Sequence, residues 1–167
     1  MTRVRQLIET LELQPHPEGG WYREVFRSVA HVTPADDRPA RSAMTSIYFL
    51  LEAGQHSRWH RVVSDEVWVH LEGTPLALWT ADAALRTAPA HTRLGPVDAH
   101  GTRPQHVVAA GQWQAAEPIA MHTSGDYALA ACMVGPGFDF ADFSLMPDGS
   151  DEAALMRHHW PELARLI

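Results

Sequence analysis

The chain of 167 residues has little cysteine, and it lacks the long hydrophobic runs that several protein classes require. Cys132 is the only cysteine, which excludes an intrachain disulfide. Because it lies in the apolar run 127–134, we expect a buried structural thiol. No apolar run approaches the roughly 18 to 20 residues of a membrane helix, and the N-terminus leads into an amphipathic segment rather than a signal-peptide core. The sequence therefore predicts a cytoplasmic protein with no membrane partner.

Clustered positive charge is also missing from the chain. The formal net charge is −7, and lysine and arginine form no cluster or stripe along the sequence. A protein that binds the phosphate backbone of DNA or RNA needs such a basic footprint. Nucleic acid is therefore not an expected partner.

The composition is that of a globular protein with many short elements. Hydrophobic residues make up 46% of the chain and charged residues 20%, with 12 prolines and 11 glycines to form turns. The length suits one well-buried domain, and no linker divides the chain. We therefore predict a single all-β domain over residues 1–167, with a barrel core from about 20 to about 145.

Helical patterns occur near the two ends of the chain. An apolar stripe at helical spacing predicts a short helix over residues 2–12. Ser150, followed by two acidic residues, is typical of a helix start, and Pro161 can open a second short helix over 162–166. The sequence thus predicts short N-terminal and C-terminal helices around the β domain.

Alternating runs between turn residues predict the strands. The two prolines and two glycines of 15–20 predict a constrained loop, and the polar segment 31–41 predicts an exposed connection long enough for a lid. We expect a hairpin-like excursion over 82–90 and a turn over 124–126. The expected strands are 21–28, 43–51, 75–80, 91–97, 105–108, 112–116 and 127–134.

The segment 54–73 holds the polar residues of greatest chemical interest. Residues of equal parity on a strand share one face, and a break near Ser64 and Asp65 would divide the segment into two strands. Two such strands bring His60 and Glu66 side by side inside a barrel. The spacing therefore predicts an imidazole and a carboxylate in one confined cavity.

This segment resembles the first cupin motif, and residues 109–114 resemble the second. The first motif is Gly54-x5-His60-x-Val62-x3-Glu66-x6-Gly73, and the second is Ala109-x-Gly111-x2-Gln114. In the usual motifs, histidines stand where this chain has Val62 and Gln114. Two of the four usual metal ligands are therefore replaced.

Three further motifs resemble the fifth cupin family, a small family within the cupin superfamily. They are Pro15-His16-Pro17-Glu18-Gly19-Gly20-Trp21-Tyr22-Arg23-Glu24, Ser64-Asp65-Glu66-Val67-Trp68 and Gly135-Pro136-Gly137-Phe138-Asp139-Phe140. The resemblance implies a double-stranded β-helix, or jelly-roll barrel, that forms a homodimer and is similar in shape to dTDP-4-dehydrorhamnose 3,5-epimerase. Where the family often has a histidine directly after the tryptophan, this chain has Val69, and His70 comes one place later.

One functional hypothesis is a metal-independent epimerase or isomerase that needs no cofactor. His60 would act as acid or base on a sugar or keto-acid-like small molecule, because its ordinary pKa lies near neutral pH. Glu66 would orient and tune the ring, and Tyr22 or Tyr48 would supply a second proton. The plain alternative is that His60 and Glu66 form a satisfied polar pair in a pocket without catalysis.

Two other hypotheses use the same cavity. A metal-dependent enzyme would hold Zn, Fe or Mn through His60, Glu66 and Gln114. A non-catalytic binding module would use aromatic walls and a few polar groups, although most large aromatics belong to cores. The Asp139 and Asp142 side chains are expected in solvent. The ligand-binding candidates are Ser57, Trp68, His70, Gln114, Trp113, Glu18 and Phe138.

Overall fold

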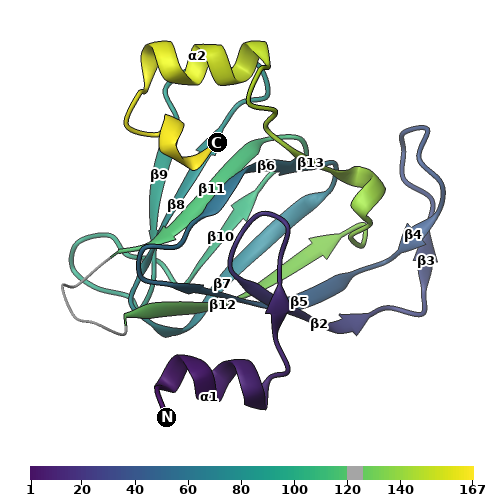
Figure 1. Ribbon diagram of the computed structural model, residues 1–167. Coiled ribbons are helices and arrows are strands. Elements are labelled where there is room, and N and C mark those ends of the chain that lie inside the picture. The colour runs from purple at the N-terminus through teal and green to yellow at the C-terminus, as the bar shows by residue number, and fades with distance from the viewer. Residues whose placement is uncertain (120–125) are drawn as a thin grey trace.

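The computed structural model describes residues 1–119 and 126–167, and it consists of two antiparallel sheets that face each other (Figure 1). Most of the predicted turn at 124–126 lies outside the described residues. The six-stranded sheet runs β1 (Gln14–Pro15), β2 (Trp21–Arg27), β5 (Thr45–Glu52), β12 (Tyr127–Gly135), β7 (Asp65–Gly73) and β10 (Gln105–Val108). The five-stranded sheet runs β13 (Phe143–Leu145), β6 (Ser57–Val62), β11 (Trp113–Pro118), β8 (Leu76–Ala81) and β9 (Ala90–Leu94). The predicted all-β jelly roll is confirmed.

Short helices cover the outer faces of the two sheets (Figure 1). Helix α1 (Arg3–Thr10) buries Val4 and Leu7 against Leu50 of the six-stranded sheet. Helix α2 (Asp151–His159) starts at Ser150, whose side chain accepts a hydrogen bond from the Ala153 amide, as the sequence predicts. The expected helix at 162–166 is reduced to one 3-10 turn, η2 (Ala164–Leu166). Both predicted helical ends are therefore present, and each buries one face of a sheet.

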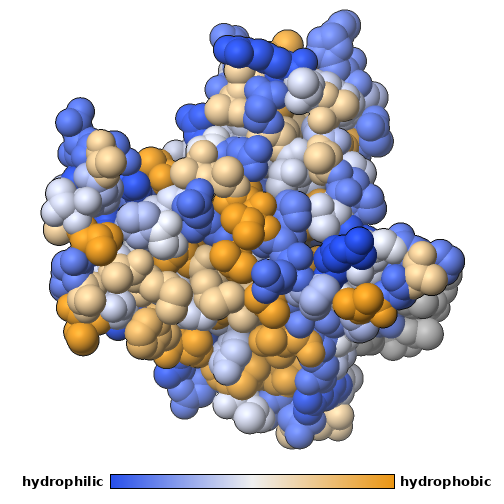
Figure 2. Space-filling model, turned by 180° about the vertical axis from the view of Figure 1, so that it is seen from behind, coloured by the Kyte–Doolittle hydropathy of each residue, from blue (hydrophilic) through white to orange (hydrophobic). Residues whose placement is uncertain are grey.

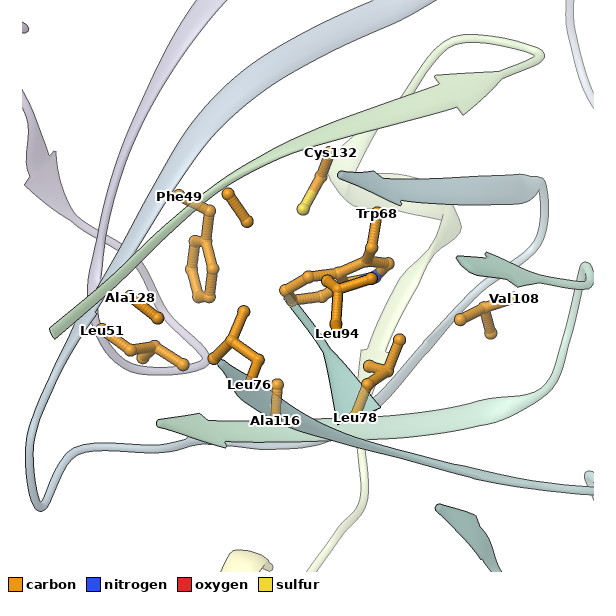
Figure 3. Packing of buried hydrophobic residues seen from close by; sticks show 11 residues of the cluster. Phe49, Leu51, Trp68, Leu76, Leu78, Leu94, Val108, Ala116, Ala128 and Cys132 are labelled. Carbon is orange, nitrogen blue, oxygen red and sulfur yellow. The ribbon is translucent and has the colours of Figure 1, made fainter. Parts of the chain in front are cut away.

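The hydrophobic core fills one end of the space between the sheets (Figure 3). Trp68 of β7 lies in this core, where Leu78 of β8 approaches from the opposite sheet. Phe49 packs edge-on against Trp68, with ring centroids 5.6 Å apart. Strand alternation explains the arrangement, because Phe49 and Leu51 point inward while Leu50 between them points toward α1. The inward residues of β5 beyond Phe49, toward Thr45, leave the core and reach a cavity.

Most of the connection 31–41 is exposed, as predicted from sequence, but two arginines near its end anchor it to the rest of the fold. It carries β3 (His31–Val32) and leads into β4 (Arg41–Ser42), which pair with each other. Arg38 and Arg41 both bind the carboxylate of Asp142, at 3.0 and 2.9 Å. Asp142 retains 5% exposure, so the expectation that it lies in solvent is wrong, because two guanidinium groups from a distant segment cover it. Asp139, in contrast, is exposed as expected and caps the 3-10 turn η1 (Phe140–Asp142).

Candidate functional site

A cavity of about 320 Å³ lies between the sheets, beside the core. Its floor is polar and its walls are mainly aromatic and aliphatic. The predicted break between β6 and β7 is confirmed, and it places His60 and Glu66 in this one cavity. The lining residues are Gln14, His16, Glu18, Tyr22, Glu24, Arg27, Thr45, Ile47, Phe49, His60, Val62, Glu66, Cys132, Val134, Phe138, Asp139, Phe140 and Phe143.

The loop between β1 and β2 delivers Glu18 to the floor of the cavity. Gly20 has a φ of +70°, and a Cβ atom there would lie 2.6 Å from the Leu50 carbonyl oxygen. This close approach to β5 requires glycine, since any larger residue would clash and be strained. The amide of Arg58 donates to the Glu18 carbonyl at 2.8 Å, which ties the loop to β6 as well. The glycines therefore serve to hold a buried carboxyl group in place.

Glu18 and His60 form a buried pair that can share one proton. His60 Nδ1 lies 2.7 Å from the Arg58 carbonyl oxygen, which can only accept, so this nitrogen carries a hydrogen. The other ring nitrogen, Nε2, is 3.3 Å from Glu18 Oε2, and the Ser57 hydroxyl donates to Glu18 Oε1 at 2.9 Å. Burial raises the pKa of Glu18 to about 8 and lowers the pKa of His60. Near neutral pH, the carboxyl group of Glu18 therefore holds the proton, and its Oε2 lies close to a neutral imidazole.

Glu66 occupies a different part of the floor from the one predicted. Both nitrogens of His60 face other groups, so Arg58 and Glu18, rather than Glu66, orient the ring. Gln114 Nε2 donates to Glu66 Oε2 at 2.6 Å, and the Trp68 indole donates to the Gln114 oxygen at 2.9 Å. Burial raises the pKa of Glu66, while the charge of His60 acts in the opposite direction. Glu66 thus tunes His60 by its charge and not by a hydrogen bond.

Aromatic rings make up much of the cavity wall. The His16 ring lies edge-on to Tyr22 at 4.5 Å between centroids, and it stacks on Phe140 at 6.2 Å. The Phe143 ring packs against both His16 and His60, with centroids 6.0 and 5.5 Å apart. Burial lowers the pKa of His16 to about 4, so this ring is neutral at pH 7. The wall therefore presents π faces, while the floor presents acids and imidazoles, of which Glu18 and His16 are uncharged at pH 7.

Five of the predicted site residues line the cavity: His60, Glu66, Tyr22, Glu18 and Phe138. The structure adds His16 and Phe143. His16 stands two residues before Glu18 in a motif recognised from sequence, and this proximity is the signal that could have identified it. Phe143 has no comparable local signal, because it reaches the cavity only through the pairing of β13 with β6.

The other predicted site residues lie behind the cavity or away from it. Ser57 and Gln114 form a supporting layer, bonded to Glu18 and Glu66. Trp68 and Trp113 belong to two hydrophobic clusters instead of the cavity wall, as Figure 3 shows for Trp68. His70 Nε2 lies 3.1 Å from the Thr74 carbonyl oxygen and does not line the cavity. Tyr48 points to the outer face, where it packs with the residues under α1.

The buried state of Cys132 agrees with the sequence prediction. The residue lines the cavity beside Glu66, and burial raises the pKa of its thiol well above the ordinary value. The thiolate is the reactive form of cysteine. Cys132 is therefore a neutral thiol that packs against the cavity floor.

The residues of the cavity do not fit the four-ligand metal centre of cupins. Val62 offers no donor atom, and the oxygen of Gln114 is engaged by the Trp68 indole. Within residues 1–119 and 126–167, no three or more His, Cys, Asp or Glu side chains are grouped as metal ligands. His60 and Glu66 remain, from different strands, as two of the usual ligands.

The raised pKa of Glu18 predicts a pH-dependent contribution to stability. Its folded-state pKa of about 8 lies above the ordinary value of 4.5, so this contribution is present below pH 4.5 and is lost as the pH rises to about 8. The titratable groups that face Glu18 are His16, His60 and Glu66. In urea unfolding between pH 5 and 8, we expect Glu18→Gln to gain stability relative to wild type as the pH rises. A constant difference would contradict the buried, protonated state of Glu18.

The jelly roll with a cavity between its two sheets defines the molecule as a cupin. A family model described as Cupin superfamily (DUF985) matches residues 5–146, and the chain belongs to this family. A crystal structure of a protein from Shewanella oneidensis is 31% identical, with a TM-score of 0.79, and the match covers 99% of this chain and 95% of the other. A hypothetical protein from Leishmania major is 30% identical, with a TM-score of 0.81 and coverages of 100% and 97%. Membership of the family supports a small-molecule-binding role.

A curated relative matches only part of the chain. Over 59 residues, the sequence is 39% identical to isoleucine–tRNA ligase of Halorhodospira halophila (strain DSM 244 / SL1). The match covers 33% of this chain and 6% of that enzyme. So short a segment says nothing about the activity of this chain.

Several large apolar side chains are exposed on and near β2. Hydrophobic residues gather in the middle of the face shown in Figure 2. The exposed apolar residues between 25 and 44 are Val25, Phe26, Val29, Val32 and Met44.

The predicted homodimer and cytoplasmic location stay predictions. Neither α-helix within the described ranges has the length and hydrophobicity to cross a membrane.

Proposed function

We propose that this cupin is a metal-independent epimerase or isomerase of a sugar or keto-acid-like compound, with His60 as acid and base. The observation that supports the proposal is the 3.3 Å approach of Glu18 Oε2 to His60 Nε2 on the floor of the cavity. A carboxyl group with a pKa near 8 exchanges protons readily at neutral pH, which is the property that a general acid or base needs. A titratable pair of this kind beside a cavity favours an enzyme over a pocket that only binds its ligand.

The proposed reaction begins at a carbon atom next to a carbonyl group. When Glu18 is ionised, the pair consists of a carboxylate and a neutral imidazole. The pair takes the proton from this carbon through Glu18 Oε2, which passes it to Nε2 of His60. The electrons of the broken C–H bond move into the carbonyl group and form an enolate. Glu18 stabilises the imidazolium that results, in the way that a buried carboxylate supports a catalytic histidine.

Return of a proton completes the reaction. Tyr22 belongs to β2 of the six-stranded sheet, whereas His60 belongs to β6 of the five-stranded sheet, so the two side chains approach the cavity from different walls. A proton delivered by the Tyr22 hydroxyl to the enolate carbon inverts that centre. The imidazolium then releases its proton to solvent, and the tyrosinate takes one up from solvent. Return from His60 on the original face leads only to exchange with solvent. Epimerisation therefore requires both residues, and exchange requires only His60.

Solvent deuterium incorporation tests the proposal. Keto sugars, keto acids and sugar nucleotides would be incubated with the protein in D₂O, and exchange at the carbon next to the carbonyl would be followed by NMR. We expect at least one compound to exchange faster with protein than without it. Binding without exchange across the whole panel would favour the alternative, a non-catalytic binding module.

Metal content separates the proposal from the metal-dependent alternative. We expect protein purified without an affinity tag to contain well under one equivalent of Fe, Mn or Zn by elemental analysis. The reason is that Val62 and the engaged Gln114 replace two of the usual ligands, and no three His, Cys, Asp or Glu side chains within the described ranges are grouped as metal ligands. A near-stoichiometric metal that disappears in His60→Ala would overturn the proposal and assign His60, Glu66 and Gln114 to a metal site.

A further inference from the structure

The charge of the cavity sets the kind of ligand it can accept. Four acidic side chains line it, but Arg27 is the single arginine or lysine among the described lining residues. Arg27 donates to both carboxylate oxygens of Glu24, at 2.9 and 2.7 Å, and to the Phe138 carbonyl oxygen at 3.2 Å. Its guanidinium group is therefore already paired with a carboxylate, in a contact that is partly exposed. An anionic ligand would have to compete with Glu24 for this arginine.

The proposed reaction does not use Glu66, so this acidic group is available to bind a ligand. Its side chain is buried, and its contacts are the amide of Gln114 and the thiol of Cys132, both uncharged. A buried carboxylate is costly unless a proton or a cation neutralises it. His60 does not fill this role in the resting protein, because burial lowers its pKa and leaves the ring neutral at pH 7.5, and both of its nitrogens face other groups. A positively charged ligand would supply the missing partner.

The walls near these acids favour an organic cation. Tyr22, Phe49 and Phe143 line the cavity with Glu66, and Phe138 packs edge-on against Phe140 nearer the Arg27 end, with centroids 5.0 Å apart. Faces of aromatic rings attract ammonium groups with roughly 0.5 to 2 kcal/mol, more when water is excluded. A cavity of about 320 Å³ has room for a small organic molecule rather than a bare ion. Acid on the floor and aromatic rings on the walls together match an alkylammonium group.

We infer that the ligand of this cavity carries an ammonium group, held by Glu66 and the surrounding aromatic rings. The inference rests on the proposed function for the reaction and deepens it by giving the substrate class. The substrate is then an amino-substituted hydroxy-carbonyl compound, such as an amino sugar, whose carbonyl end meets His60. Phosphate-bearing sugar nucleotides are disfavoured, because no free cationic side chain lines the described part of the cavity.

A matched set of probes tests this inference without knowledge of the substrate. Choline, 3,3-dimethyl-1-butanol and 3,3-dimethylbutanoate have similar shapes but carry a positive charge, no charge and a negative charge. By isothermal titration calorimetry at pH 7.5, we expect choline to bind at least about tenfold more tightly than the alcohol, which corresponds to about 1.4 kcal/mol. The carboxylate should bind more weakly than the alcohol. Equal affinities, or tighter binding of the carboxylate, would overturn the inference.

Two variants locate the ammonium site. Glu66→Gln keeps the size of the side chain and removes its charge, so the preference for choline over the alcohol should fall to about twofold or less, while the alcohol binds as before. Phe143→Leu should weaken choline binding about three- to tenfold. If Glu66→Gln does not fold, Phe143→Leu still tests the site, because a loss of choline binding in either variant alone can reveal it. Thermal melts would confirm that each variant folds, and an unchanged preference in both would refute the inference.

The two proposals fail in different ways. A protein that exchanges deuterium into an uncharged keto sugar but shows no preference for choline would refute the ammonium site alone. A protein that prefers choline but catalyses no exchange with any keto or amino-keto compound would refute the proposed reaction alone.

Discussion

Replacement of His60 by glutamine is expected to lower deuterium exchange by about 10²- to 10⁴-fold, the usual contribution of a general acid or base. Glutamine can still form hydrogen bonds, but it cannot take up a proton at neutral pH. Replacement of Glu18 by glutamine should also lower the rate, because the imidazolium would lose its buried counter-charge. NMR rates on the best compound of the panel would measure both effects.

The pH profile of exchange distinguishes a catalytic pair from a structural one. Because the carboxylate form of Glu18 supports the base, the wild-type rate should rise with pH toward the Glu18 pKa of about 8 and then level off. Glu18→Gln should remove this rise. A merely structural loss would lower the rate equally at every pH and leave the profile unchanged.

His31→Gln provides the matched control for these variants. His31 is exposed on β3, and its Nδ1 lies 3.0 Å from the nearby Val29 carbonyl oxygen. Because His31 is not among the residues that line the cavity, the exchange rate should stay within about twofold of wild type. The role of His60 would be refuted if His60→Gln retained a similar rate while both variants melted like wild type.

Replacement of Asp142 by asparagine is expected to destabilise the fold by about 3 kcal/mol. Its carboxylate accepts hydrogen bonds from Arg41 at 2.9 Å on both oxygens and from Arg38 at 3.0 Å. The hydrogen bonds from Arg41, and then those from Arg38, hold the pKa of Asp142 below its ordinary value. Asparagine leaves two partly buried guanidinium groups without their negative partner. Urea unfolding at pH 7 would measure the loss.

The effect of Asp142 extends to the cavity wall. Asp142 ends the 3-10 turn that includes Phe140, and Phe143 follows directly, so the two arginines fix the segment that bears both rings. Asp36→Asn is the control, because Asp36 is about half exposed and its ion pair is with Arg38, so we expect a much smaller loss of stability than for Asp142→Asn. Similar losses in the two variants would contradict the structural role given to the Arg41–Asp142 contact.

Local patterns predicted much of this architecture. Alternation along residues 57–73 correctly placed His60 and Glu66 in one cavity, because the direction of a strand side chain depends only on its parity and on which face is buried. The stripe from Val4 to Leu11 correctly predicted a helix for the same kind of reason, since its period is a property of neighbouring residues. Turn residues then marked the ends of most strands.

Local patterns did not predict the point along a strand at which the core ends and the cavity begins. Trp68 has the same parity as Glu66 and follows it by two residues, yet it lies in the core while Glu66 lines the cavity. Parity gives the face of a sheet but not the depth at which the core ends and the cavity begins. That depth depends on side chains such as Leu78, which arrive from the opposite sheet.

The residue pattern alone specified a jelly roll, the strands of the site, the pairing of one histidine with an acid, and the replacement of metal ligands at Val62 and Gln114. It named Glu66 as the partner of that histidine, whereas the folded chain brings Glu18 to His60 across 42 positions of sequence. Contacts of this kind depend on how the loop from Pro15 to Gly20 packs against β5 and β6, and not on the spacing of neighbouring residues. Tertiary packing therefore decided which acid shares the proton and which acid remains for a ligand.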